Sequence, residues 1–386
     1  MRSTSHQNPE IVATAIALPD YSHSQEQVIG YLRAWLAEEP EKAAKAAAIL
    51  GNAEVARRYT VRPAEWYLAH TSVSERSEVY QQEMVRLSER AATEALAGAG
   101  MDPGEIGLIV STSCTGLMIP SVESYLMNRM AFRATTRRLP LTELGCVAGA
   151  AALSQARQFL RTEPESAVLV IAVELASLTA QLEDFSLTNI VAASIFGDGA
   201  AAAIVLGAHH PRSSANGGGA PSGKSGGGAA SGKSSDGRNP RLRARIVASR
   251  SVLFPETLEM MGFRNTDSGL RIFLSPRVPR FIREALPGYL RPFLADHGLA
   301  LEDLSHFLLH PGGRKVLEGL ERELGLIRSH TQLSWDVLRD YGNLSSATVL
   351  FLLHRFGQVG EPKPGDHGLM MAVGPGFSCE MVLLQW

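Results

Sequence analysis

Two short segments of the chain share one design, one segment in each half. Residues 145–151 (Gly-Cys-Val-Ala-Gly-Ala-Ala) and 342–348 (Gly-Asn-Leu-Ser-Ser-Ala-Thr) each place a reactive or polar side chain at the start of a helix of small residues. An offset of 197 residues overlays Cys146 on Asn343, and it also brings the apolar run 108–110 onto the run that ends at His310. The repeat predicts two related halves with a site at their seam.

Composition excludes several classes of function. The 386 residues are 45% hydrophobic and 20% charged, which is ordinary for a globular chain long enough for two domain-sized cores. A formal net charge of −2 with scattered basic residues indicates no nucleic-acid partner. No apolar run is long enough for a signal peptide or a membrane span, so we expect no membrane association and a cytoplasmic location.

The three cysteines, Cys114, Cys146 and Cys379, are too few and too widely spaced for a disulfide framework or a close-spaced zinc site. No phosphate loop, dinucleotide fingerprint or metal cluster is found in the sequence either. We therefore expect no metal, and each cysteine has to be judged singly.

A stretch rich in glycine, serine and lysine, from Ser213 to Gly237, interrupts the chain. It has too few apolar side chains to offset the entropy of ordering, and it lies between two strand patterns. We predict three regions: an N-terminal half with the nucleophilic cysteine (1–212), a disordered insertion (213–240), and a C-terminal half with the histidine and the asparagine (241–386).

Apolar runs alternate with helical periodicities on both sides of the insertion, which predicts an α/β fold. The helix that starts at Cys146 carries no charge as far as Leu153, so we expect it to be buried on all sides. Helices are predicted over 81–99, 146–161, 276–294, 313–324 and 343–356, and strands over 107–113, 167–173, 200–206, 244–248, 307–309, 369–373 and 379–384.

Three side chains at the seam could carry chemistry. Cys146 in the first turn of a helix lies near unpaired amides and the positive end of the helix dipole, which favour the thiolate. His310 ends an apolar strand, where catalytic groups of such sheets collect. Asn343 could donate to an oxyanion. The alternatives are a small buried thiol for Cys146 and a plain helix cap for Asn343.

Five motifs in order make the chain resemble the type III polyketide synthases, the chalcone synthase-like family: residues 144–150, 195–201, 310–313, 342–347 and 374–377. The resemblance implies a thiolase-like fold with two αβαβα halves related by a pseudo-twofold axis. It also implies a homodimer that uses malonyl-CoA and acyl-CoA thioesters, with no acyl carrier protein and no further cofactor. The insertion is not a feature of that family.

The resemblance assigns the three catalytic roles. Cys146 matches the nucleophile that takes the starter acyl group and holds the growing chain. His310 matches the residue that pairs with the thiolate and, with Asn343, hydrogen-bonds the thioester oxygen while malonyl-CoA decarboxylates. Two fixed donors act where the enolate charge develops, and removing one such donor typically costs ~10²–10³ in rate.

The resemblance also implies a set of binding residues. Phe196 matches a gatekeeping aromatic, although its surroundings alone would suggest core packing. Ile119 precedes Pro120 in a loop that would reach the neighbouring subunit, with a peptide bond of the type that can be cis. The cavity would be lined by Cys114 (or this thiol is simply buried), Thr179, Phe254, Gly374 and Pro375, and coenzyme A would contact Arg57, Arg58 and Arg314.

The product is less determined than the chemistry. Phe254 keeps an aromatic ring where tetrahydroxynaphthalene synthases carry tyrosine, which favours malonyl priming and a hydroxynaphthalene or phloroglucinol-type product. The alternative is a long-chain acyl-CoA starter that gives alkylpyrones or alkylresorcinols. More distant alternatives are a ketoacyl synthase III-like enzyme, a thiolase with Cys379 as second cysteine, and a non-catalytic scaffold. Ala372 and Val373 depart from the plant pattern and leave the shape of the cyclisation cavity open.

Overall fold

The structure is a computed structural model, and it describes residues 8–69, 71–181, 184, 186–214 and 242–386. The predicted insertion therefore lies outside the described residues, apart from its first two serines. Of these, Ser213 is buried and the Ser214 amide donates to Glu10 Oε2 over 3.0 Å.

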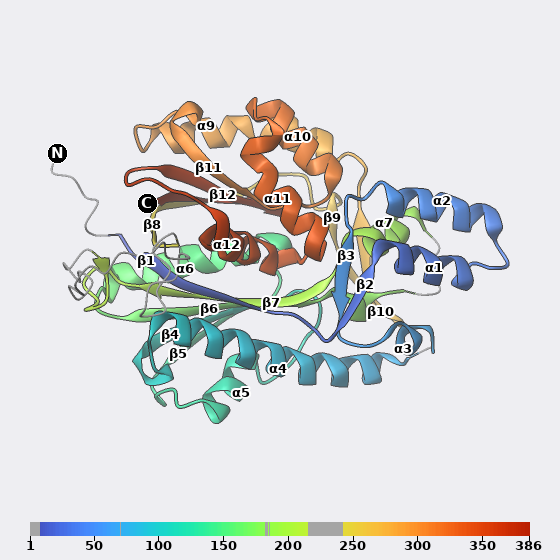
Figure 1. Cartoon of the computed structure of the whole chain (residues 1–386), viewed down its shortest axis with the longest axis horizontal. Helices are drawn as coiled ribbons and strands as arrows, with labels where there is room; N and C mark the ends of the chain where they lie inside the picture. Colours follow the sequence, from blue (N-terminus) through green and yellow to red (C-terminus); the bar gives the residue numbers. More distant parts are fainter. Residues whose placement is uncertain (1–7, 70, 182–183, 185, 215–241) are drawn as a thin grey trace, which may run out of the picture.

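One continuous sheet of nine strands runs through the molecule (Figure 1). Its order is β11-β12-β13-β8-β1-β7-β6-β4-β5. The strands are β1 (Glu10–Ala17), β4 (Ile106–Thr112), β5 (Arg137–Leu141), β6 (Ala167–Leu175), β7 (Asp198–Leu206), β8 (Ala244–Leu253), β11 (Leu304–Leu309), β12 (His367–Gly374) and β13 (Ser378–Gln385).

The two halves of this sheet repeat one pairing pattern. β4 is parallel to β6, and β6 is antiparallel to β7. In the same way β11 is parallel to β12, and β12 is antiparallel to β13. The half-sheets join where β1 pairs with β7 along most of its length and with β8 only at Glu10↔Arg245 and Ile11↔Ala244. The predicted duplication is thus confirmed in the strands.

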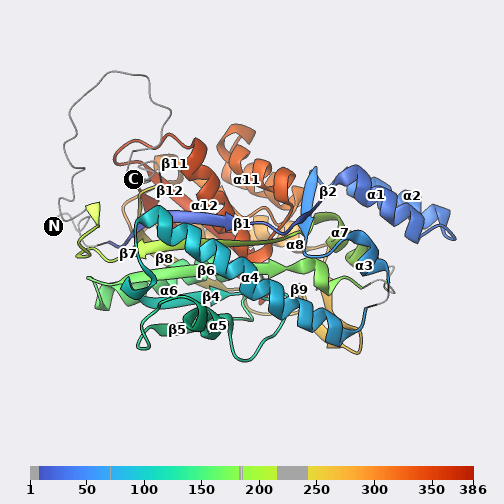
Figure 2. The ribbon, with the colours of Figure 1, turned by 60° about the horizontal axis from the view of Figure 1, so that its bottom comes forward.

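Helices cover both half-sheets and fill the space between them, which gives five layers (Figures 1 and 2). α6 (Ala148–Thr162) and α12 (Thr348–Val359) form the middle layer and contact strands of both halves. α4 (Val73–Ala99) and α5 (Val122–Arg129) cover the first half-sheet. The second is covered by α8 (Val278–Ala285), α9 (Pro287–Ala295), α10 (Arg314–Leu324) and α11 (Arg328–Tyr341).

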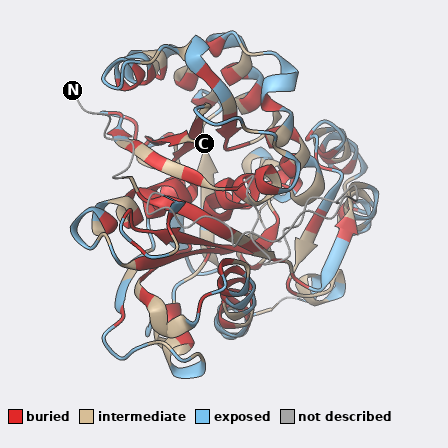
Figure 3. Cartoon of the chain, turned by 60° about the vertical axis from the view of Figure 1, so that its left-hand side comes forward, coloured by how far each residue is buried: buried red, intermediate tan, exposed pale blue. Residues whose placement is uncertain are grey.

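Burial follows the layers (Figure 3). Buried residues fill the central strands, such as β6 and β7, and much of the middle helices, whereas the outer helices are exposed on one side. The middle cluster includes Leu153 from α6, Phe351 from α12 and Met370 from β12. The uncharged helix after Cys146 is therefore buried as predicted, and the α/β thiolase-like fold is confirmed.

Some predicted boundaries were wrong for local reasons. α4 begins eight residues before the predicted start, because Ser72 and Glu75 form a capping box. The single helix predicted over 276–294 is two helices, and the second starts at Pro287, a residue that favours a first helical position. The helix predicted from Asn343 begins only at Thr348, after the 3₁₀ turn η7 (Ser345–Ala347).

The remaining elements lie at one end of the molecule, where α1 and α2 project in both views (Figures 1 and 2). This end carries the helices α1 (Gln25–Trp35), α2 (Pro40–Gly51), α3 (Ala64–Leu68) and α7 (Leu187–Ile195). It also carries the two-stranded sheet of β2 (Tyr21–Ser24) with β3 (Arg57–Thr60) and the hairpin of β9 (Met261–Thr266) with β10 (Gly269–Leu274). Among the described residues, no helix has the length and apolar character needed to cross a membrane.

Candidate active site

Cys146 lies in the 3₁₀ turn η3 (Gly145–Val147), which leads into the buried helix α6. Its side chain is 7% exposed. Gly145 before it has φ of +59°, and a Cβ there would lie 2.5 Å from the ring of Pro375. Glycine is therefore needed at 145 both for the backbone and for the close approach of Pro375. This turn fixes the thiol at the seam between the halves.

A hydroxyl from the second half lies between two thiols of the first. Ser345 Oγ is 3.3 Å from Cys146 Sγ and 3.3 Å from Cys114 Sγ. Ser345 opens η7 with φ of +48°, an unusual conformation for a residue that is not glycine. Sequence reasoning missed Ser345, although it stands two residues after Asn343 in the repeated motif. The structure brings Cys114 and Cys146 together around it.

Asn343 is held by its own backbone and side chain. Its N–H donates to Ile195 O over 2.6 Å, and its carbonyl accepts from the Gly197 N–H over 3.1 Å. Its Oδ1 accepts from the Ser345 N–H over 2.8 Å, so the side chain orients the loop before η7. The Nδ2 group reaches only Gly312 O, at 3.5 Å. The amide donor thus remains available for a ligand oxygen.

His310 follows β11, and its backbone N–H donates to Met371 O of the neighbouring β12 over 2.8 Å. The ring is 2% exposed, and neither nitrogen has a hydrogen-bond partner within the described chain. Burial lowers the pKa of His310 to about 4, so the imidazole is neutral. Buried polar atoms are normally satisfied, so two ring nitrogens without partners are unusual. The ring lines neither cavity at the thiols, and the catalytic role of His310 stays a prediction.

β12 lies between β11, which His310 follows, and the turn that holds Cys146. It runs parallel beside β11 and ends at Gly374, where a Cβ would lie 3.3 Å from the Cys146 amide nitrogen. Gly374 therefore packs against the backbone of Cys146 and does not line the cavities at the thiols. The predicted role of Gly374 in substrate binding stays a prediction.

The thiol of Cys146 is not activated by its position alone. Burial raises its pKa to about 12, although the hydrogen bond with Ser345 acts in the opposite direction. The start of the helix was predicted to favour the thiolate, but the neutral His310 supplies no positive charge, and the loss of hydration outweighs the helix effect. A thiolate at Cys146 therefore requires transfer of the proton to another group.

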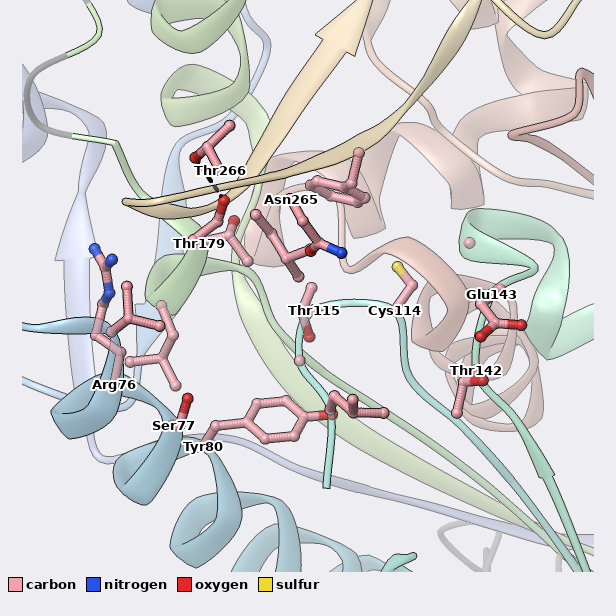
Figure 4. A pocket seen from close by; sticks show the side chains of 18 of the residues that line it. Arg76, Ser77, Tyr80, Cys114, Thr115, Thr142, Glu143, Thr179, Asn265 and Thr266 are labelled. Carbon is pink, nitrogen blue, oxygen red and sulfur yellow. Dashed lines mark hydrogen bonds between the residues drawn. The ribbon is translucent and has the colours of Figure 1, made fainter. Parts of the chain in front are cut away.

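Two cavities meet at the thiols. The smaller, about 250 Å³, contains Cys146 and Phe196 and is walled by α1 and α7; the larger, about 630 Å³, extends towards α4 and the β9–β10 hairpin. Cys114, Thr179 and Pro375 line both cavities, and their part in substrate binding stays a prediction. Figure 4 shows the larger cavity, with Cys114 beside Thr115 and with Asn265 and Thr266 of β9 across from α4.

Other predicted binding residues lie elsewhere. Phe254 is 4% exposed and packs edge-on against Phe281 and Tyr289, so it belongs to an aromatic core and does not line either cavity. Ile119 is 87% exposed, and the Ile119–Pro120 bond is cis. Cys379 is fully buried in β13 and lines neither cavity, which gives no support to a second thiolase cysteine.

The three predicted coenzyme A contacts differ in exposure. Arg57 is exposed, and half-buried Arg314 begins α10 with an ion pair of 3.7 Å to Glu318. These two stay predictions. Arg58, in contrast, is buried, and backbone carbonyls occupy its guanidinium.

A buried carboxylate joins the two halves beside the thiols, and sequence reasoning missed it. Glu174 is fully buried at the end of β6. Its Oε2 accepts from the Cys114 N–H over 3.1 Å and from Thr115 Oγ1 over 2.9 Å. Its Oε1 accepts from the Ser346 N–H over 3.3 Å and from the Ser346 hydroxyl. Among the described residues, no group of histidine, cysteine, aspartate and glutamate could hold a metal ion.

Comparison with known proteins identifies the family of this chain. The N-terminal domain of chalcone and stilbene synthases matches residues 1–210, and the C-terminal domain matches residues 245–386. The chain is 35% identical to 1,3,6,8-tetrahydroxynaphthalene synthase of Streptomyces peucetius subsp. caesius, over 97% of this chain and 93% of that protein. It is 32% identical to a putative chalcone synthase of Bacillus subtilis, over 97% and 98% of the two chains.

A solved structure agrees with these matches. The 1,3,6,8-tetrahydroxynaphthalene synthase of Streptomyces coelicolor A3(2), a bacterial type III polyketide synthase, superposes with a TM-score of 0.85. It is 29% identical and covers 97% of this chain and 99% of its own. The chain belongs to the chalcone and stilbene synthase family. Its activity is that of a type III polyketide synthase, a condensing enzyme of the acyltransferase type.

Proposed function

We propose that the protein condenses malonyl-CoA units onto a malonyl-derived starter held on Cys146 and releases a hydroxynaphthalene or phloroglucinol-type product. The observation that carries the proposal is the meeting of two cavities at the thiols, one containing Cys146 and the other lined in part by polar side chains. Coenzyme A thioesters are the only substrates proposed, without an acyl carrier protein or a further cofactor. A homodimer and a cytoplasmic location remain part of the proposal.

Loading begins with the two neutral groups at the seam. His310 has a free ring nitrogen that accepts the proton of Cys146, which yields a thiolate paired with an imidazolium. The thiolate attacks the thioester carbonyl of the starter, and the coenzyme A thiolate leaves with the proton from His310. The raised pKa of Cys146 makes this paired transfer necessary, because the isolated buried thiolate is unfavourable.

Extension uses the same donors on the second substrate. An N–H of His310 and the Nδ2 group of Asn343 donate to the thioester oxygen of malonyl-CoA, and the C–C bond to the carboxylate breaks with release of carbon dioxide. The enolate carbon then attacks the acyl carbonyl on Cys146. Collapse of that adduct expels the cysteine thiolate and leaves a chain longer by two carbons on coenzyme A.

The larger cavity favours a polar, ketone-bearing chain. Ser77, Thr142 and Asn265 line it, and their side chains make no hydrogen bond within the described residues. A poly-β-ketone presents a carbonyl at every second carbon and can accept from such donors, whereas a long alkyl chain would leave them without partners when it displaces water. Malonyl priming is therefore preferred on this observation. Phe254 no longer supports it, because Phe254 does not line the cavity.

A second candidate rests on the smaller cavity. Val28, Tyr31 and Trp35 of α1 give it an apolar wall, which would suit a long acyl starter and an alkylpyrone or alkylresorcinol product. Purified enzyme with malonyl-CoA alone, analysed by mass spectrometry, separates the two. An aromatic product supports malonyl priming. No product with malonyl-CoA alone, together with pyrones from long acyl-CoA plus malonyl-CoA, would overturn it in favour of the second candidate.

The donors are tested separately from the nucleophile. His310→Ala and Asn343→Ala should each abolish malonyl-CoA decarboxylation, whereas Cys146→Ala should keep decarboxylation and lose starter loading. The measurement is carbon dioxide release, with acetyl-CoA formed in step. Decarboxylation that persists in both donor variants would refute their assignment.

A further inference from the structure

Arg58 is a buried cation at the edge of the active-site chamber. It lies in β3 opposite His23 of β2 and is 4% exposed. Its guanidinium donates to the backbone carbonyl of Ser194 over 2.8 Å, and also to the carbonyl of Ala193 and to Oε1 of Gln25. A buried charge is costly unless it is matched, and among the described residues this one has no carboxylate ion pair, while its Nε has no hydrogen-bond partner. The three oxygens are its counterpart.

Two of these oxygens belong to the end of a helix. Ala193 and Ser194 are in the last turn of α7, where carbonyls lack partners within the helix and carry the negative end of its dipole. α7 has no basic residue in its own last turn. Arg58 supplies that positive charge from another element and ties the end of α7 to the β2–β3 sheet.

The end of α7 leads directly into the residues that face the substrate. Phe196 follows the helix and lines the cavity that contains Cys146. The carbonyl of Ile195 accepts from the Asn343 N–H, and the Gly197 N–H donates to the Asn343 carbonyl. Below this segment, a Cβ at Gly197 would be 3.5 Å from the Cβ of Arg58. Arg58 thus contacts the support of both Phe196 and Asn343.

The same guanidinium also holds the projecting helices. Gln25 starts α1, its backbone N–H donates to Ala56 O over 2.9 Å, and its side-chain amide donates to Leu50 O near the end of α2. The Gln25 Oε1 that remains is the one bonded to Arg58. Arg58 and Gln25 together therefore join α1, α2 and β3 to the end of α7.

We propose that Arg58 is a positioning residue, which fixes the last turn of α7 and through it the ring of Phe196 and the amide of Asn343, and that it is not a ligand of coenzyme A phosphates. The proposal rests on the proposed function, in which thioesters reach Cys146 past Phe196. It assigns the phosphate contact, if the pair of arginines makes one, to exposed Arg57.

The test compares Arg58→Met with Arg57→Met, because both changes remove one charge from neighbouring positions. The first readout is the rate at which iodoacetamide alkylates Cys146, followed by peptide mass spectrometry, since this reagent carries no phosphate. Arg58→Met should change that rate several-fold, and Arg57→Met should not. A phosphate ligand at 58 would leave the alkylation rate unchanged.

The second readout is malonyl-CoA decarboxylation. Arg58→Met should lower kcat by roughly 10- to 100-fold, the range expected from a small displacement of a catalytic group, with a smaller change in KM. Arg58→Lys should restore part of kcat. A rise in KM with kcat unchanged, or wild-type behaviour in both readouts, would overturn the proposal.

Folding is controlled by thermal melting, and Gln25→Ala is the second variant if Arg58→Met does not fold. It removes one of the three acceptors and should shift both readouts in the same direction by a smaller factor; unchanged readouts in this variant would overturn the proposal as well. If wild-type protein fails to decarboxylate malonyl-CoA, the proposed function fails, whereas the alkylation comparison still tests the role of Arg58.

Discussion

The starts of α6 and α12 have one backbone shape and different surroundings. In each, a residue with positive φ (Gly145 at +59°, Ser345 at +48°) opens a 3₁₀ turn, and the helix follows after three residues. The structural offset between them is therefore 200 residues and not 197. Cys146 corresponds to Ser346, and Asn343 precedes the second turn.

The opposite half treats these two turns differently. Glu174 at the end of β6 places its carboxylate on the amide and hydroxyl of Ser346. At the corresponding end of β12, Gly374 brings no side chain to the amide of Cys146. We call the turn at Ser346, which the Glu174 carboxylate contacts, the sealed side. The turn at Cys146, which no side chain of Gly374 contacts, is the open side. Cys146 thus differs from its counterpart Ser346 in two ways. It carries a thiol in place of a hydroxyl, and the strand that faces it ends in a glycine in place of a glutamate.

The largest test exchanges the reactive member of the pair for alanine. Cys146→Ala should form no acyl-enzyme and no product, because no other thiol takes its place on the mechanism proposed. Ser346→Ala should load normally and lose about 1–3 kcal/mol of unfolding free energy, since Glu174 loses a donor. Intact-protein mass spectrometry and denaturant titration measure the two effects. An acyl adduct on the Cys146→Ala protein would break the comparison.

Gly374→Ala tests the open side directly. The added Cβ would lie 3.1 Å from the Val147 amide nitrogen and 3.3 Å from that of Cys146, so the turn must shift. We expect turnover to fall roughly 100-fold and the unfolding free energy to fall by about 1–3 kcal/mol.

Gly288→Ala is the matched control for this change. A Cβ at Gly288 in α9 meets no atom within 4 Å, so turnover should be unchanged and the unfolding free energy unchanged or slightly higher. Wild-type turnover in Gly374→Ala would show that the thiol does not depend on the empty space.

The sealed side is tested by pH. Burial raises the pKa of Glu174, although its hydrogen bond from Ser346 lowers it. At a pH between the pKa of the unfolded chain and that of the folded protein, the folded protein therefore holds a proton that the unfolded chain has released. The unfolding free energy should therefore fall as pH rises from the unfolded pKa through the folded one, by at most about 1.4 kcal/mol per pH unit. Glu174→Gln should lack this part of the slope. Equal slopes in denaturant titrations of both proteins would contradict it.

The smallest effect concerns Ser345, the counterpart of Gly145. Ser345→Gly should relieve the positive φ and gain up to about 1 kcal/mol of stability, offset in part by loss of the hydroxyl between the thiols. Ser345→Ala loses the hydroxyl and keeps the strain, so it should be the less stable of the two. Thermal melting resolves the order, and the reverse order would mean that the backbone is not strained.

The layered fold and part of the lining of the two cavities at the thiols could be predicted from the sequence. The duplication, the charge-free helix after Cys146 and the cavity-lining positions Cys114, Thr179 and Pro375 follow from local pattern and resemblance. The register of the repeat did not follow, because the three residues before Ser345 extend the loop without any change in residue type that marks it.

Residues that act across the seam were also beyond sequence reasoning. Glu174 ends an apolar strand, and its partner Ser346 is brought to it only by the packing of the other half. Arg58 has the sequence context of a solvent-exposed basic pair, yet its place in the β2–β3 sheet buries it. Phe254 was assigned to the cavity by type, but the neighbouring aromatic rings bury it. Pairings of this kind depend on long-range contacts that no local pattern encodes.

The position of β1 bears on how the chain reaches this fold. This strand separates β7 from β8, and its residue Glu10 pairs with Leu206 on one side and Arg245 on the other. Such distant pairings close large loops and slow the search for the native sheet. Any partly folded form without β1 exposes two unpaired edges rich in apolar side chains, the kind that recruit other chains. We therefore expect the pairing of β1 with β7 and β8 to be the step that decides between productive folding and aggregation.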